Sequence, residues 1–63
     1  MTATDELTDL LTNFGGGDRE RSKAIVADIA AGKLRLPPCF SLRNGNPEQT
    51  ARVHELARIV TTN

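Results

Sequence analysis

The sequence predicts an all-α fold: three short helices with a long, proline-containing connector between the second and the third. Apolar residues recur at helical spacing in three segments. A glycine run separates the first two segments, and a stretch with two adjacent prolines separates the last two. A chain of 63 residues has the length of one small domain, so we expect a single helical domain over residues 1–63.

The first helix is expected to begin after Thr4, a candidate N-cap, and to end at the glycine run 15–17. Asp5 and Glu6 then occupy the first turn, where the helix dipole favours acidic side chains. Its apolar face has the spacing i, i+3, i+4, i+7 and consists of Leu7, Leu10, Leu11 and Phe14. The glycine run resembles a phosphate-binding loop only superficially, because no Gly-Lys-Ser/Thr follows it, and we expect it to be a connector.

The second helix is expected to run from its cap Asp18 to Ala31, with Gly32 as the residue that ends it. One stripe of this helix should be buried: Ser22, Ile25, Val26, Ile29 and Ala30. A strip of small residues lies on the opposite side: Ala24, Ala27 and Ala31. Alanine is the best helix former, but small side chains also permit close helix approach, and the strip is our candidate homodimer seam.

The third helix, 47–61, has the clearest start. Asn46 is the predicted N-cap, Pro47 takes the first helical position, and Gln49 stands where a capping box requires it. Its buried seam is predicted to be Val53, Leu56, Ala57 and Val60. Two outward ion pairs are expected from the spacing: Glu48 with Arg52, and Glu55 with Arg58.

The connector Lys33–Gly45 alternates basic and apolar residues in its 33–43 part. Pro37 and Pro38 prevent a regular helix there, so we expect an extended arm or two brief strands. Two interpretations stay open. The apolar side chains, Leu34, Leu36, Phe40 and Leu42, either cover the helical core or lie in a partner's groove.

Charge is segregated although the formal net charge is zero. Residues 1–17 carry three acids and no base; residues 18–43 carry six bases and three acids; the last twenty residues are balanced. A dedicated nucleic-acid-binding domain usually has a clear basic excess, and this chain has only a basic patch. The single cysteine excludes an internal disulfide and a cysteine-rich metal site, so no metal or cofactor is expected. With neither a long apolar run nor a basic leader, we expect a cytoplasmic protein.

Catalysis is not expected. His54 and Cys39 are the residues with the most obvious chemistry, but a nucleophile–base pair needs a pocket with an orienting acid and oxyanion donors. A chain this short has little room for such a pocket. We therefore expect Cys39 to be a small buried hydrophobic residue.

Binding is the expected function. Only fifteen large apolar side chains follow Met1, which favours self-association or a partner. The leading hypothesis is a small regulatory or inhibitory protein, of the kind phages and bacteria encode, that binds a larger protein. The candidate partner-binding residues are Arg35, Phe40, Arg43, Arg52 and Ile59.

Part of the chain resembles winged helix-turn-helix regulators of the GntR type. Residues 29–34, followed by Leu36 and Pro37, are similar to their first helix and turn. Four later residues are similar to their turn and recognition helix: Gly45, Gln49, Thr50 and Arg52. The segment between Pro37 and Gly45 is too short for the intervening helix, so no family is assigned. The alternative function is DNA binding by helix 47–61 and the connector, through Lys33, Arg35, Arg43, Gln49, Thr50, Arg52 and His54.

Overall fold

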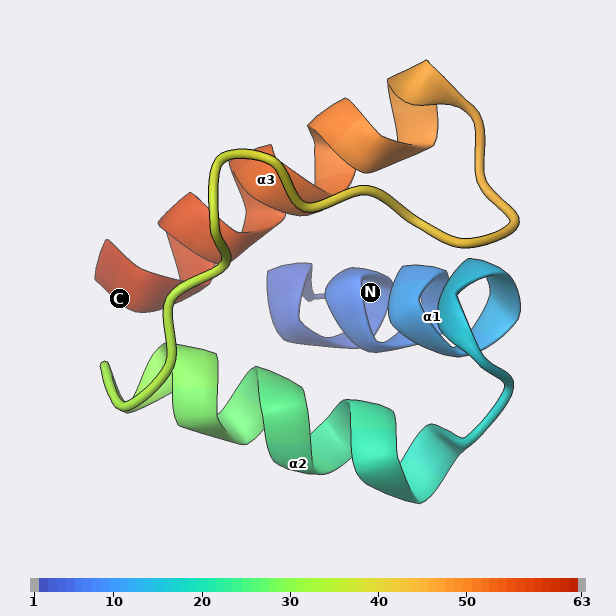
Figure 1. Ribbon diagram of the computed structural model, residues 1–63. Helices are drawn as coiled ribbons and strands as arrows, with labels where there is room; N and C mark the ends of the chain where they lie inside the picture. The colour runs from blue at the N-terminus through green and yellow to red at the C-terminus, as the bar shows by residue number, and fades with distance from the viewer. Residues whose placement is uncertain (1, 63) are drawn as a thin grey trace.

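The computed structural model describes residues 2–62 and has three helices (Figure 1): α1 (Ala3–Gly15), α2 (Arg19–Ala30) and α3 (Pro47–Thr62). No strand occurs within these residues, so the all-α prediction is confirmed and the alternative of two brief strands is wrong. The connector, residues 31–46, links α2 to α3. Each helix packs against the other two.

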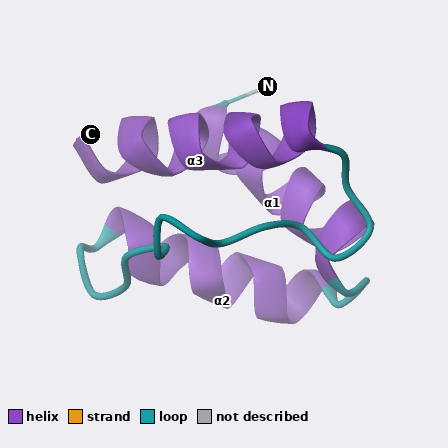
Figure 2. Ribbon diagram, turned by 45° about the horizontal axis from the view of Figure 1, so that its top comes forward, coloured by secondary structure: helices purple, strands orange, loops and turns teal. Residues whose placement is uncertain are grey.

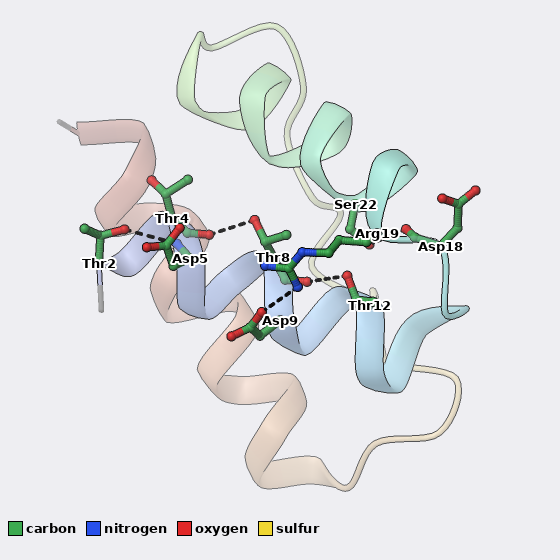
Figure 3. Close-up of polar contacts among 9 residues, drawn as sticks. All are labelled: Thr2, Thr4, Asp5, Thr8, Asp9, Thr12, Asp18, Arg19 and Ser22. Atoms are coloured by element: carbon green, nitrogen blue, oxygen red, sulfur yellow. Dashed lines mark hydrogen bonds and ion pairs between the residues drawn. The ribbon is translucent and has the colours of Figure 1, made fainter.

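The start of α1 lies two residues before the predicted one. Thr2, not Thr4, is the N-cap, and its Oγ1 accepts a hydrogen bond of 3.2 Å from the backbone N–H of Asp5. The earlier start adds a helical bond from the N–H of Glu6 to the carbonyl of Thr2. The carbonyl of Thr4 accepts from the hydroxyl of Thr8 (2.8 Å), within the helix (Figure 3). Both threonines can cap, and the one that gives the longer helix does so.

The glycine run separates α1 from α2, and Asp18 caps α2, as predicted. α1 ends at Gly15, and Gly17 takes a φ of 83° that favours glycine. Asp18 then caps α2, its Oδ1 accepting from the N–H of Arg21 at 3.2 Å. An ion pair of 2.8 Å between Arg19 and Asp9 joins α2 to α1 (Figure 3).

The end of α2 also follows the sequence signal, one residue earlier than expected. Ala31 is the C-cap rather than the last helical residue, and Gly32 has a φ of 78°. The N–H of Lys33 donates a hydrogen bond of 2.9 Å to the carbonyl of Asp28, one of the carbonyls that lack a helical partner at the end of α2.

The capping box of α3 is confirmed in both directions. The N–H of Gln49 donates to Asn46 Oδ1 (2.8 Å), and the N–H of Asn46 donates to Gln49 Oε1 (3.0 Å). Pro47 is the first helical residue, as predicted.

The core lies between the three helices and includes one connector residue, Leu42. All four predicted seam residues of α3 are buried. The buried apolar residues are Leu7, Leu11, Val26, Ile29, Leu42, Val53, Leu56, Ala57 and Val60. Leu10, Phe14 and Ile25 are half-buried against them, whereas Ala30 is exposed, which corrects the predicted width of the α2 stripe.

Two buried hydroxyls, those of Thr8 and Ser22, are bonded within their own helices. Thr8 donates to the carbonyl of Thr4, and Ser22 donates to the carbonyl of Asp18 at 3.0 Å (Figure 3). Each hydroxyl thus bonds the carbonyl of the residue four positions earlier. A small polar side chain can therefore be buried between helices without leaving a hydrogen-bonding atom unsatisfied.

The predicted pairing of Arg52 with Glu48 is wrong. The Arg52 guanidinium binds both carboxylate oxygens of Glu6 on α1, at 2.7 and 3.1 Å, and also binds Glu55 at 2.9 Å. A bidentate pair with a neighbouring helix is geometrically better than a pair on the outside of one helix.

Across residues 2–62, none of the helices combines the length and the apolar character that crossing a membrane requires.

Candidate functional site

The connector is pinned to the helices at several points although it has no regular structure. The N–H of Leu42 donates to Thr50 Oγ1 on α3 (3.2 Å), and the N–H of Asn44 donates to the carbonyl of Phe14 on α1 (2.8 Å). Figure 2 shows the connector running along α2 and α3. It is an ordered part of the fold.

Three of the four apolar connector side chains cover the core. Leu42 is 5% exposed, and Leu36 and Phe40 are half-buried against the core. Leu34 is 37% exposed. The structure therefore supports the covering interpretation for three residues and leaves Leu34 available at the surface.

His54 holds the connector in place. Its Nε2 lies 3.0 Å from the carbonyl oxygen of Phe40, and because a carbonyl only accepts, this nitrogen carries the donated proton. The two rings also meet edge to face, with centroids 5.9 Å apart. The imidazole thus has a positioning role in the fold.

Cys39 is exposed, so its predicted burial is wrong. The N–H of Phe40 bonds the carbonyl of Pro37 at 2.9 Å, which closes a tight turn over residues 37–40. The turn directs Phe40 toward the core and leaves Cys39 on its outer side. A turn of this kind was not expected in an extended arm.

Ion pairs within the described part of the chain neutralise some charged side chains and leave others exposed and unpaired. Arg19 and Arg52 bind acids of α1, Asp9 and Glu6 respectively. The hydrogen bond from Arg52 lowers the pKa of Glu6 and raises that of Arg52. Within residues 2–62 the connector cations, Lys33, Arg35 and Arg43, are exposed and form no ion pair.

A hollow of about 300 Å³ lies where the connector leaves α2 and passes α3. Its floor is formed by Ile29 and Ala57, which are buried, and by the half-buried Leu36. Its exposed rim carries Leu34, Arg35, Arg58 and Thr61, and His54 closes the remaining wall. We call this hollow the Arg35 groove.

A second hollow, of about 410 Å³, lies at the other end of α2. Arg21 and Arg43 stand at its edge together with Asp18, and Ile25 and Phe40 supply apolar surface. We call it the Arg43 hollow. The two hollows and the connector between them form what we call the connector face.

The predicted partner-binding residues do not form one surface. Arg35, Phe40 and Arg43 belong to the connector face. Arg52 binds Glu6 and therefore faces α1, and Ile59, seven residues later, lies on that same side of α3 with 37% of its surface exposed. The predicted dimer seam, Ala24, Ala27 and Ala31, is exposed.

The residues that could read DNA are engaged within the fold. Thr50 accepts from Leu42, and His54 binds Phe40. Gln49 completes the capping box, and Arg52 binds Glu6 and Glu55. The connector covers the α3 side that carries Thr50 and His54.

Sequence reasoning missed the contribution of α2 and α3 to the connector face. His54, Arg58 and Thr61 have the spacing i, i+4, i+7 and so share one side of α3, which is a detectable signal. Arg21 and Ile25 are likewise one turn apart. The residue spacing alone did not predict that the connector packs against these sides of α2 and α3.

No group of three or more His, Cys, Asp or Glu side chains within residues 2–62 is arranged to hold a metal ion. Comparison with protein families, with curated proteins and with solved structures yields no match to this chain.

Proposed function

We propose that the chain is a small, non-catalytic regulatory or inhibitory protein that binds a larger protein through its connector face. The observation that carries the proposal is the pairing of the charges. Two of the three acids of α1, Glu6 and Asp9, are matched within the fold by Arg52 and Arg19, whereas the connector presents cations that are unpaired within residues 2–62, beside hollows with apolar surface. Such a surface suits an acidic partner.

The ordering of the connector also supports binding. Its anchors to Thr50, His54 and Phe14 fix the backbone before any partner arrives. A pre-ordered segment loses less conformational entropy on binding than a disordered arm does. We place this activity in the cytoplasm of a bacterial or phage-infected cell, and a homodimer through Ala24, Ala27 and Ala31 stays a prediction.

DNA binding is less well supported, because a groove-reading helix needs side chains free to reach base edges. Gln49, Thr50 and His54 make intramolecular bonds instead. The remaining connector cations would contact phosphates without reading sequence.

The test is affinity capture from a lysate of the source cells, with and without nuclease. We expect a protein to be retained in both conditions, to be lost from the Arg35→Glu variant, and to be kept by Lys23→Glu. Lys23 is an exposed cation of α2 outside both hollows, so the two variants change the charge equally. Capture that disappears with nuclease would support DNA binding, and equal capture by both variants would contradict the connector face.

A further inference from the structure

We propose that the Arg35 groove binds an acidic segment of the partner protein, which inserts one large apolar side chain between Leu34 and Ala57. This inference rests on the proposed function and adds the chemistry of the partner. It also assigns the binding to the Arg35 groove rather than to another hollow along the connector.

The shape of the groove fits one inserted side chain. Its volume, about 300 Å³, lies at the lower end of the range of ligand pockets. Ile29 and Ala57 form an apolar floor, and Leu34 is 37% exposed at the rim. An apolar side chain seated there would remove the exposed surface of Leu34 from water.

Two polar side-chain groups of the groove walls are already bonded within the fold. His54 Nε2 binds the carbonyl of Phe40, and the Thr61 hydroxyl binds the carbonyl of Ala57 at 2.7 Å. The groove is lined by two arginines, Arg35 and Arg58, and by no carboxylate. Arg35 forms no ion pair within residues 2–62. A guanidinium binds a carboxylate through two parallel hydrogen bonds, so the groove selects an acidic segment.

Two other occupants fit the groove less well. Single-stranded nucleic acid would need an aromatic platform, and the one aromatic ring in the lining, His54, already packs against Phe40. A second copy of this chain offers few acids on α1, because Glu6 and Asp9 are bound to Arg52 and Arg19 and, within the described chain, only Asp5 of that helix has no ion pair.

The experiment is an NMR titration of the isotopically labelled full chain with synthetic peptides. The probe is a peptide of about seven residues with one leucine among aspartates and glutamates. Its controls replace that leucine by serine or the acids by lysines. We expect amide shifts at Leu34, Leu36, Ala57 and Thr61, and affinity that falls steeply with salt. Shifts located elsewhere, or equal binding of a control peptide, would overturn the proposal.

Two matched variants sharpen the result. Arg35→Glu should weaken peptide binding about tenfold or more, because it puts a carboxylate where the peptide's own acids would sit. Lys23→Glu should change it less than about twofold, because Lys23 is exposed and lies outside the groove lining, where solvent and salt screen its charge. Both side chains are exposed, so both variants should keep the wild-type amide spectrum outside the mutated region. Undiminished binding by Arg35→Glu would overturn the proposal.

The other occupants are tested with the same protein. An oligothymidylate that gives the same shifts at the same concentration, or a dimer that dissociates in Arg35→Glu, would overturn the assignment to an acidic segment. The outcome is also separable from the proposed function. If nuclease-resistant, Arg35-dependent capture succeeds and the acidic peptide fails to bind, this inference is wrong and the proposed function stands.

Discussion

Leu42 shows how one connector residue joins the parts of the fold. Its side chain is 5% exposed within the core, and its N–H is bonded to Thr50 on α3. Gly45 lies so close to it that an added Cβ would stand 2.8 Å from both the Cβ and the Cδ1 of Leu42. The alternating pattern of the connector predicted an apolar position here, but it could not predict which of the four apolar residues would be fully buried.

Gly45→Ala should therefore lower the free energy of unfolding by about 1–3 kcal/mol, because the new methyl group displaces Leu42. Gly15→Ala is the matched control, since its Cβ would meet Leu42 at an ordinary 3.9 Å. Urea unfolding of both variants checks this. Equal stability of the two would show that Leu42 is not packed as described.

A substitution at Leu56, compared with one at an exposed residue of the same helix, tests the packing of the core. It is 1% exposed, and Leu56→Ala should cost about 2–5 kcal/mol through lost contacts and a cavity. Ile59→Ala, on the same helix at 37% exposure, should cost less than about 1 kcal/mol. Thermal unfolding followed by circular dichroism compares them, and a reversed order would contradict the assigned buried side of α3.

The elements differ in how far the sequence determined them. The helices follow from apolar spacing and from caps, and the Asn46–Gln49 box was predictable because its residues lie three apart. The start of α1 was not, because Thr2 and Thr4 are both able to cap. The course of the connector depends on Phe14, Thr50 and His54, which are distant from it in sequence.

The anchor of the connector on α3 can be tested by Thr50→Val, which keeps the shape of the side chain and removes the acceptor for the Leu42 N–H. We expect a loss of about 1–3 kcal/mol and faster hydrogen exchange at the Leu42 amide. Thr12→Val is the control, because the Thr12 hydroxyl bonds only within α1. Unchanged exchange at Leu42 would contradict the anchor.

The Glu6–Arg52 pair, which joins α1 to α3, predicts sensitivity to acid. Arg52 lowers the pKa of Glu6 from its ordinary value of 4.5, so the pair stabilises the fold above that pH and the contribution is lost as the pH falls below it. Wild type should lose more stability between about pH 7 and pH 3 than Glu6→Gln does. Glu48→Gln, at a carboxylate without an ion pair in the described chain, should behave as wild type. Equal losses in wild type and Glu6→Gln would show that the pair is not formed.

At the scale of the molecule, the acidic start of the chain and the basic connector lie on two different sides of the fold. The acids near the start of the chain are partly matched by Arg19 and Arg52, and the connector cations are left beside the hollows. The alternation of bases with apolar residues predicts Arg35 and Arg43 as contact residues, and both line hollows beside the connector. The sequence pattern could not place Arg52 and Ile59 on the other side of α3, since that depends on where α1 packs. The radius of gyration, 10.3 Å, is that of a tightly folded chain of this length, with the connector included.

The most direct measurement of the central claim is amide hydrogen exchange of the chain, free and bound to the protein that it captures. We expect slower exchange on binding at the connector face, at residues 33–36 and 57–61 above all. Thr50 and its neighbours at the start of α3 should exchange at the same rate in both states. Protection confined to the start of α3, or to the alanine strip of α2, would contradict the claim that the connector face is the binding surface.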